Sequence, residues 1–211
     1  MSKAKEMLYP VGVENLYLAF MVEGKDSESA IPTYEPEIYS LPTIEKIGIA
    51  GNITSANKWA SNKLFVNVSK NDKFTLTLDH TAIPVEVMDK VMGVVSTKGI
   101  TFDNSRPKEF PMFALGFIAP LSDGEKVARW YPKVQVTPPE ESFETITEET
   151  NIPTQQLVMT ATPLLFNDNT KVDYNSARES ATGVTAKKFM EQVVCDETEL
   201  ETLFPIEGAS S

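Results

Sequence analysis

Apolar and polar residues alternate along much of this chain, and a period of two is typical of β-strands. The clearest case is the segment 74–79, where Phe74, Leu76 and Leu78 alternate with polar residues. Residues 13–22 are apolar on both faces, which predicts a strand buried on both sides. Further strands are expected at 44–54, 110–119, 126–136 and 155–162. The turn sequence Ser122-Asp123-Gly124 predicts that 110–119 and 126–136 form a hairpin.

Apolar residues repeat with the spacing of one helix face in two segments of the chain. Residues 84–92 begin with Pro84, which suits the first turn of a helix, and Gly93 follows as a residue that can end one. A second helix is predicted from Thr185, a suitable N-cap, because apolar residues then repeat at helical spacing as far as Val194. The chain after Cys195 is expected to form a mobile acidic tail.

Two long polar segments are expected to leave the β-rich body as loop arms. Residues 23–42 contain Pro32, Pro36 and Pro42, and residues 55–72 are rich in Asn and Ser. Within the second arm, Trp59, Leu64 and Phe65 are candidate contacts between subunits, because interfaces are anchored by such side chains. The alternative, that these side chains fold back onto their own core, stays open.

These elements predict a mainly β protein, with a β-sandwich or barrel-like body, one flanking α-helix and a short C-terminal helix. We expect a single domain over residues 1–211, with arms at about 23–42 and 55–72 and a C-terminal helix and tail at about 185–211. A chain of 211 residues can bury enough surface to fold without a disulfide.

The formal net charge of -11 changes this picture in one respect. An acidic chain lacks the attraction for phosphates on which nucleic-acid-binding proteins rely. The densest acidic segment, residues 137–151, contains no Lys or Arg. Its carboxylates are Glu140, Glu141, Glu144, Glu148 and Glu149. They are candidates either for a surface that DNA passes without adhering or for an exposed loop that only aids solubility.

The sequence contains no combination of residues that points to catalysis or to a cofactor. His80 is the single histidine and Cys195 the single cysteine, so no metal site with several His or Cys ligands can form. We expect Cys195 to be a buried, inert thiol and His80 to be a turn residue. The polar loop 166–173 lacks the Gly and Glu of a calcium-binding loop. No apolar stretch approaches the ~20 residues of a membrane span.

Short motifs follow one another from about residue 10 to residue 205. They are VGVENLY at 11–17, GNIT at 51–54, IPVEV at 83–87, FALGF at 113–117, RWYPKV at 129–134 and PPEESFET at 138–145. Their order and spacing resemble the major tail protein family of siphophages that infect Gram-positive bacteria. The resemblance implies a non-enzymatic β-sandwich subunit with a helix on its flank. Six such subunits would form a ring, and stacked rings would form a tail tube through which double-stranded DNA passes without tight binding.

The same resemblance implies where the protein acts and with what. Its partners would be further copies of itself, a tape measure protein, a tail terminator and distal tail or baseplate proteins, with no membrane involved. Its location would be the tail of the virion, and the host cytoplasm during assembly. A carbohydrate- or protein-binding β-sandwich module is the alternative. Self-assembly separates the two, because a binding module stays small in solution whereas a tail protein forms rings or tubes.

Overall fold

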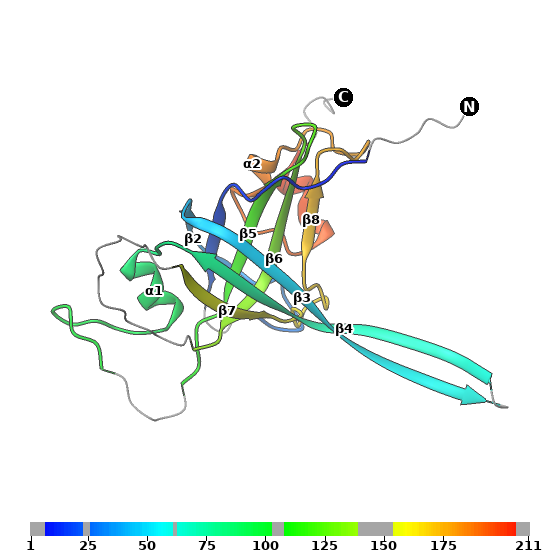
Figure 1. Ribbon diagram of the computed structural model, residues 1–211, viewed down its shortest axis with the longest axis horizontal. Helices are drawn as coiled ribbons and strands as arrows, with labels where there is room; N and C mark the ends of the chain where they lie inside the picture. Colours follow the sequence, from blue (N-terminus) through cyan, green and yellow to red (C-terminus); the bar gives the residue numbers. More distant parts are fainter. Residues whose placement is uncertain (1–6, 23–25, 61–62, 103–107, 139–153, 206–211) are drawn as a thin grey trace, which may run out of the picture.

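The computed structural model describes residues 7–22, 26–60, 63–102, 108–138 and 154–205. The protein is mainly β, as the alternating pattern predicted (Figure 1). The described strands form one eight-stranded antiparallel sheet, in which β8 pairs with β6 beside the main path β2-β1-β5-β6-β7-β4-β3. The strands are β1 (Leu16–Met21), β2 (Tyr34–Leu41), β3 (Ile44–Ala60), β4 (Lys63–His80), β5 (Phe113–Pro120), β6 (Lys126–Val136), β7 (Gln155–Ala161) and β8 (Val172–Asn175).

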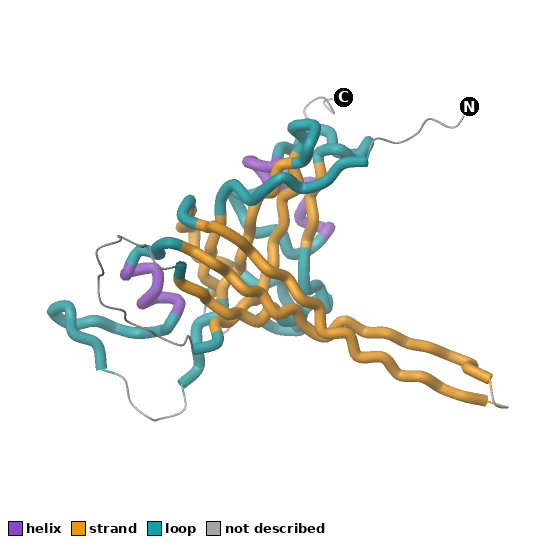
Figure 2. The backbone as a smooth tube through the Cα atoms, viewed as in Figure 1, coloured by secondary structure: helices purple, strands orange, loops and turns teal. Residues whose placement is uncertain are grey.

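The sheet is strongly curled, and the chain path shows why. Strands β2 and β3 lie at opposite ends of the strand order, yet only Pro42 and Thr43 separate them in the sequence. The two edges of the sheet must therefore come close together at this point, as in a barrel that does not close. The Thr81 amide donates to the Thr43 carbonyl (3.1 Å) and ties the link to the end of β4. Figure 2 shows the curled body, with one pair of strands running far beyond it.

The concave face of the sheet encloses the larger core. Leu16, Leu18 and Phe20 of β1 contribute to it, together with Leu76 and Leu78 of β4 on the far side of the curl. Helix α1 (Val85–Val91) closes this core, because its Val87 and Val91 side chains are buried in it. The predicted helix at 84–92 is thus confirmed, and it flanks the sheet as expected.

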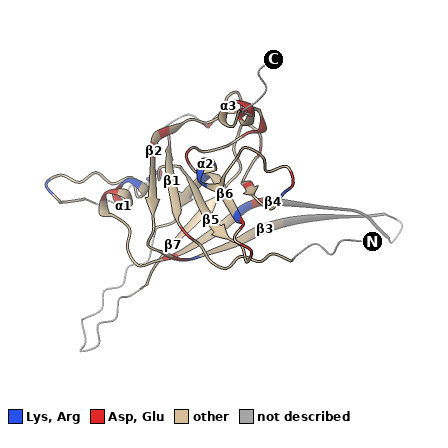
Figure 3. Cartoon of the chain, turned by 90° about the horizontal axis from the view of Figure 1, so that it is seen from above, with Lys and Arg blue, Asp and Glu red and all other residues tan. Residues whose placement is uncertain are grey.

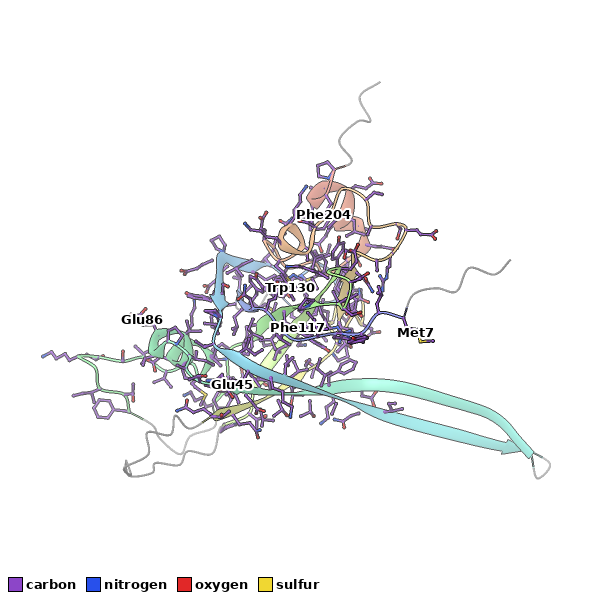
Figure 4. The ribbon with its side chains drawn as sticks, turned by 45° about the horizontal axis from the view of Figure 1, so that its top comes forward. Met7, Glu45, Glu86, Phe117, Trp130 and Phe204 are labelled. Atoms are coloured by element: carbon purple, nitrogen blue, oxygen red, sulfur yellow. The ribbon has the colours of Figure 1, made fainter. Side chains whose placement is uncertain are left out.

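The convex face carries a second core beneath the C-terminal part of the chain. Helix α2 (Ala186–Phe189), the 3-10 helix η1 (Glu197–Glu199) and helix α3 (Leu200–Leu203) form this cover. Trp130 lies at its centre, and its indole N–H donates to the carbonyl of Phe189 (3.1 Å, buried). Figure 4 shows Trp130 within the body and Phe204 above it in the C-terminal segment. Strands β1, β5 and β6 are therefore buried on both faces. For β1 this confirms the prediction made from the apolar sequence of residues 13–22.

The predictions for the two arms were wrong about local structure. Part of the predicted loop 23–42 is strand β2, whose Leu16↔Leu41 to Met21↔Tyr34 pairing follows β1. Pro36 is tolerated there because β2 is an edge strand and the register shifts beside it. The predicted arm 55–72 lies in the hairpin of β3 and β4, where each strand supplies the other's backbone partners. Loops were predicted because the first segment contains three prolines and the second is rich in Asn and Ser.

The C-terminal region also differs from its prediction. Helix α2 has a single turn, although Thr185 does cap it by accepting from the amide of Lys188 (3.1 Å). The expected mobile tail is instead folded as far as Phe204, which is 7% exposed. Asp196 and Glu199 form a capping box that starts η1. Strand β8 was not expected, and it pairs with the first part of β6.

Gly116 of β5 allows the convex core to close. A Cβ atom at this position would lie 2.6 Å from Trp130 Cε3 and 2.5 Å from Met190 Cε. We expect Gly116→Ala to lower the free energy of unfolding by about 1–3 kcal/mol, the usual cost of overpacking a core. Urea denaturation measures this loss. The control is Gly48→Ala in β3, where the nearest atom would be 3.6 Å away. Equal stability of the two variants would contradict the proposed role of Gly116.

Candidate assembly surfaces

The most prominent surface is the hairpin that β3 and β4 form beyond the body. Strand β4 pairs with β7 only from Phe74 to His80. From Lys73 to Lys63 it pairs with β3 alone among the described strands, so this part is a two-stranded ribbon. Figure 1 shows the ribbon extending away from the sheet. A two-stranded hairpin is marginally stable by itself in water, so a surface supplied from outside would stabilise it.

The hairpin carries the three residues predicted to be interface anchors. Trp59 and Leu64 are partners in the strand register, and Phe65 follows directly in β4. All three are therefore near the end of the ribbon. Their side chains lie outside the described part of the structure. The acidic candidates Glu140, Glu141, Glu144, Glu148 and Glu149 also lie outside the described residues.

Both sheet edges are unpaired within the described part of the chain. Strand β2 pairs only with β1, and β3 pairs only with β4. An unpaired edge presents a row of backbone N–H and C=O groups that a strand of another chain can extend. The length of β3, from Ile44 to Ala60, makes it the longer of the two edges.

The inner face of β3 remains apolar where the hairpin leaves the body. Ile49, Gly51 and Ile53 share the face that looks towards the concave core, and Gly51 lies opposite Phe74 of β4. Ile49 and Ile53 are nevertheless exposed, because the core ends before it reaches them. We call Ile49, Ile53 and Phe74 the hairpin base. Phe74 is half-buried and packs edge-on against Tyr131 (ring centroids 5.6 Å apart).

A second apolar surface lies on the other side of the molecule, directly after α1. Residues 94–102 form a projecting segment, here called the finger, in which Val95, Ile100 and Phe102 are exposed. Figures 1 and 3 show the finger and the ribbon on opposite sides of the body. A third exposed set, Met7, Tyr9 and Val11, lies on the N-terminal segment, where Figure 4 labels Met7.

His80 is a buried residue at the end of β4, not a residue in a turn as expected. It is 3% exposed, and its Nδ1 has no hydrogen-bond partner among the described residues. Burial lowers its pKa from the ordinary 6.5, while Glu45 and Asp79 act in the opposite direction. Glu45 accepts hydrogen bonds from the hydroxyls of Thr81 (2.8 Å) and Thr154 (3.0 Å). Through these two hydrogen bonds, Glu45 of β3 links the residue after β4 to the residue before β7.

Cys195 is buried, as predicted, and packs in the convex core. Burial raises the pKa of its thiol to about 12, so the thiolate needed for nucleophilic attack is scarce at neutral pH. The described residues contain no group of three or more His, Cys, Asp or Glu side chains that could hold a metal ion. Within the described ranges, no helix is long and apolar enough to cross a membrane.

The buried imidazole predicts a pH dependence of stability. Because the folded pKa of His80 is below the unfolded value of 6.5, the unfolded chain binds more protons once the pH falls below that value. The unfolding free energy should therefore decrease as the pH falls from 6.5 towards about 5, above the range in which carboxylates titrate. His80→Gln should flatten this part of the profile, measured by urea denaturation at each pH. Parallel profiles for the two proteins would contradict the assignment.

A scan against protein-family models finds no match, and no curated protein is similar to this chain in sequence.

Proposed function

We propose that this chain is a structural subunit that polymerises into the tail tube of a bacteriophage, a major tail protein. In this proposal, hexameric rings stack into a tube through which double-stranded DNA reaches the host. The observation that carries the proposal is the ribbon of β3 and β4, which leaves a curled sheet and has no further strand beside it in the described part of the chain. The order of the sequence motifs supports the same assignment.

A tube subunit must make contacts that join unlike surfaces, because only such contacts repeat around a ring and along an axis. This chain offers surfaces of that kind. The ribbon projects on one side and the finger on the other, and among the described strands β2 and β3 each have a single neighbour. An edge strand can take up a strand from the next subunit through backbone hydrogen bonds. A neighbouring subunit would stabilise the ribbon, because a two-stranded hairpin is marginally stable by itself in water.

The net charge of -11 fits the passage of DNA. Retention of a duplex requires Lys or Arg contacts with phosphates, and such contacts would be multiplied around every ring. A net negative charge disfavours such contacts. In the assembled particle the partners would be neighbouring copies, a tape measure protein inside the growing tube, a tail terminator and the distal tail or baseplate proteins.

Self-assembly is the direct test of this function. The purified full-length protein, concentrated stepwise, should form rings or hollow tubes visible by negative-stain electron microscopy. Sedimentation should show a matching loss of monomer as the concentration rises. A binding module of the same fold class would remain monomeric under these conditions. Monomer at every concentration, without rings or tubes, would overturn the proposed function.

The end of the hairpin provides a second test. Trp59→Ala combined with Phe65→Ala should prevent tube formation and leave the monomer folded, because losing a buried aromatic anchor costs about 2 kcal/mol or more at an interface. Electron microscopy measures the tubes, and thermal unfolding followed by circular dichroism measures the fold. The matched control is Leu165→Ala with Leu200→Ala, two exposed apolar residues outside the hairpin. Tubes from the hairpin variant, or an unfolded monomer, would contradict an interface role.

A further inference from the structure

Asp26 and Lys133 form the most buried ion pair in the described part of the chain. The Lys133 side chain is 13% exposed and the Asp26 side chain 9%. The side chains of the other described ion pairs are between 23% and 41% exposed. The Nζ atom of Lys133 contacts Oδ2 of Asp26. A primary amine and a carboxyl group are thus held against each other and largely shielded from water.

The carboxyl group of Asp26 is fixed through its second oxygen. Oδ1 accepts a hydrogen bond from the backbone amide of Leu165 (3.0 Å), in the segment that follows β7. Asp26 itself lies at the start of a tight turn, because Ser27 and Ala30 form an isolated β-bridge. One carboxyl oxygen therefore faces an N–H donor while the other faces the lysine amine.

The strand that carries Lys133 is fixed as well. The Lys133 carbonyl accepts from the amide of Thr162 (3.0 Å), and the Pro132 carbonyl accepts from the hydroxyl of Tyr34 (2.7 Å). Strand β6 also pairs with β5, β7 and β8. The amine is therefore presented from one of the best-anchored strands of the sheet, and its shielded side chain has little freedom to turn away from Asp26.

We propose that Lys133 and Asp26 join in an intramolecular amide bond, which makes this ion pair a self-catalysed cross-linking site. The inference concerns a covalent modification and does not depend on the tube function. Two reacting groups that are held in contact need no encounter step, and well-oriented intramolecular reactions are strongly accelerated for this reason. A lysine amine becomes a nucleophile once it loses its proton, and shielding from water favours that neutral form.

The reaction balances without any other reactant. A proton first moves from Nζ of Lys133 to Oδ2 of Asp26, which gives a neutral amine and a neutral carboxylic acid. The Nζ electron pair then forms a bond to Cγ, and the carbonyl electrons move to Oδ1. The Leu165 N–H stabilises this oxyanion as the donor of an oxyanion hole does. A second proton passes from Nζ to Oδ2, the Cγ–Oδ2 bond breaks, and one water leaves.

The bond would tie together segments that are far apart in the sequence. It would join the connection between β1 and β2 to β6, across the convex side of the sheet. A covalent link of this kind closes the chain between residues 26 and 133, and it restricts the unfolded chain as a disulfide does. The single cysteine, Cys195, allows no internal disulfide, so an amide would supply the covalent bracing that this chain otherwise lacks.

Intact-mass spectrometry of the denatured full-length protein tests the bond. The wild type should weigh one water less than its sequence mass. Lys133→Arg should have its full sequence mass, because a guanidinium keeps the charge of the ion pair but is not deprotonated to a nucleophile. Asp26→Ala should also have its full mass. The matched control, Lys126→Arg in the more exposed pair with Glu14, should still show the loss of water.

Tandem mass spectrometry of a tryptic digest locates the bond. Peptide 26–46 should be joined to peptide 130–171 through Asp26 and Lys133, with no cleavage after Lys133. A wild type with its full sequence mass, both fresh and after prolonged incubation at neutral pH, overturns the proposal. A loss of water that persists in Lys133→Arg also overturns it, because the water then comes from another site, such as a succinimide at Asp123-Gly124.

Discussion

Pro42 and Thr43 form the whole connection between two strands that lie at opposite edges of the sheet. A link this short cannot cross a flat seven-strand path, so the sheet has to curl until its edges approach each other. The curl creates the concave core, into which β1 and β4 both project although they are not neighbours. Helix α1 covers the open side of this core with Val87 and Val91. The main features of the body therefore depend on the continuity of the chain at this one point.

A curled sheet that fills its concave side still has a convex side to cover. Strands β1, β5 and β6 carry apolar residues on both faces, so the convex face would lie open if the C-terminal segment did not pack on it. Trp130 joins the layers, since its ring lies over Gly116 and its N–H reaches the backbone of α2. Phe189 stacks on Phe204 and extends the same layer outward. The end of the chain is thus a structural part of the core.

The surfaces proposed for assembly lie where the two cores of the body no longer cover the apolar side chains. Beyond Phe74 the sheet narrows to a ribbon, and the concave core stops before Ile49 and Ile53. After α1 the chain leaves the body as the finger, in which Val95, Ile100 and Phe102 are exposed. A chain with unlike apolar surfaces on two sides can bury both of them when copies join head to tail. Under the proposed function, the curl, the ribbon and the finger would supply the surfaces through which copies join.

The sequence by itself determined the elements whose pattern is local. Alternation at 74–79 predicted β4, and Pro84 with Gly93 predicted the extent of α1. The turn sequence 122–124 predicted the hairpin of β5 and β6. Tertiary structure alone decided the rest. The prolines at 32, 36 and 42 and the polar composition of 55–72 predicted loops. Residues 34–41, 55–60 and 63–72 are strands because β1 and a hairpin partner satisfy their backbone groups. Phe204 is buried only because Phe189 and the convex sheet lie beneath it. The burial of His80 and the exposure of Ile53 and Phe102 likewise depend on contacts between distant segments, which no local pattern encodes.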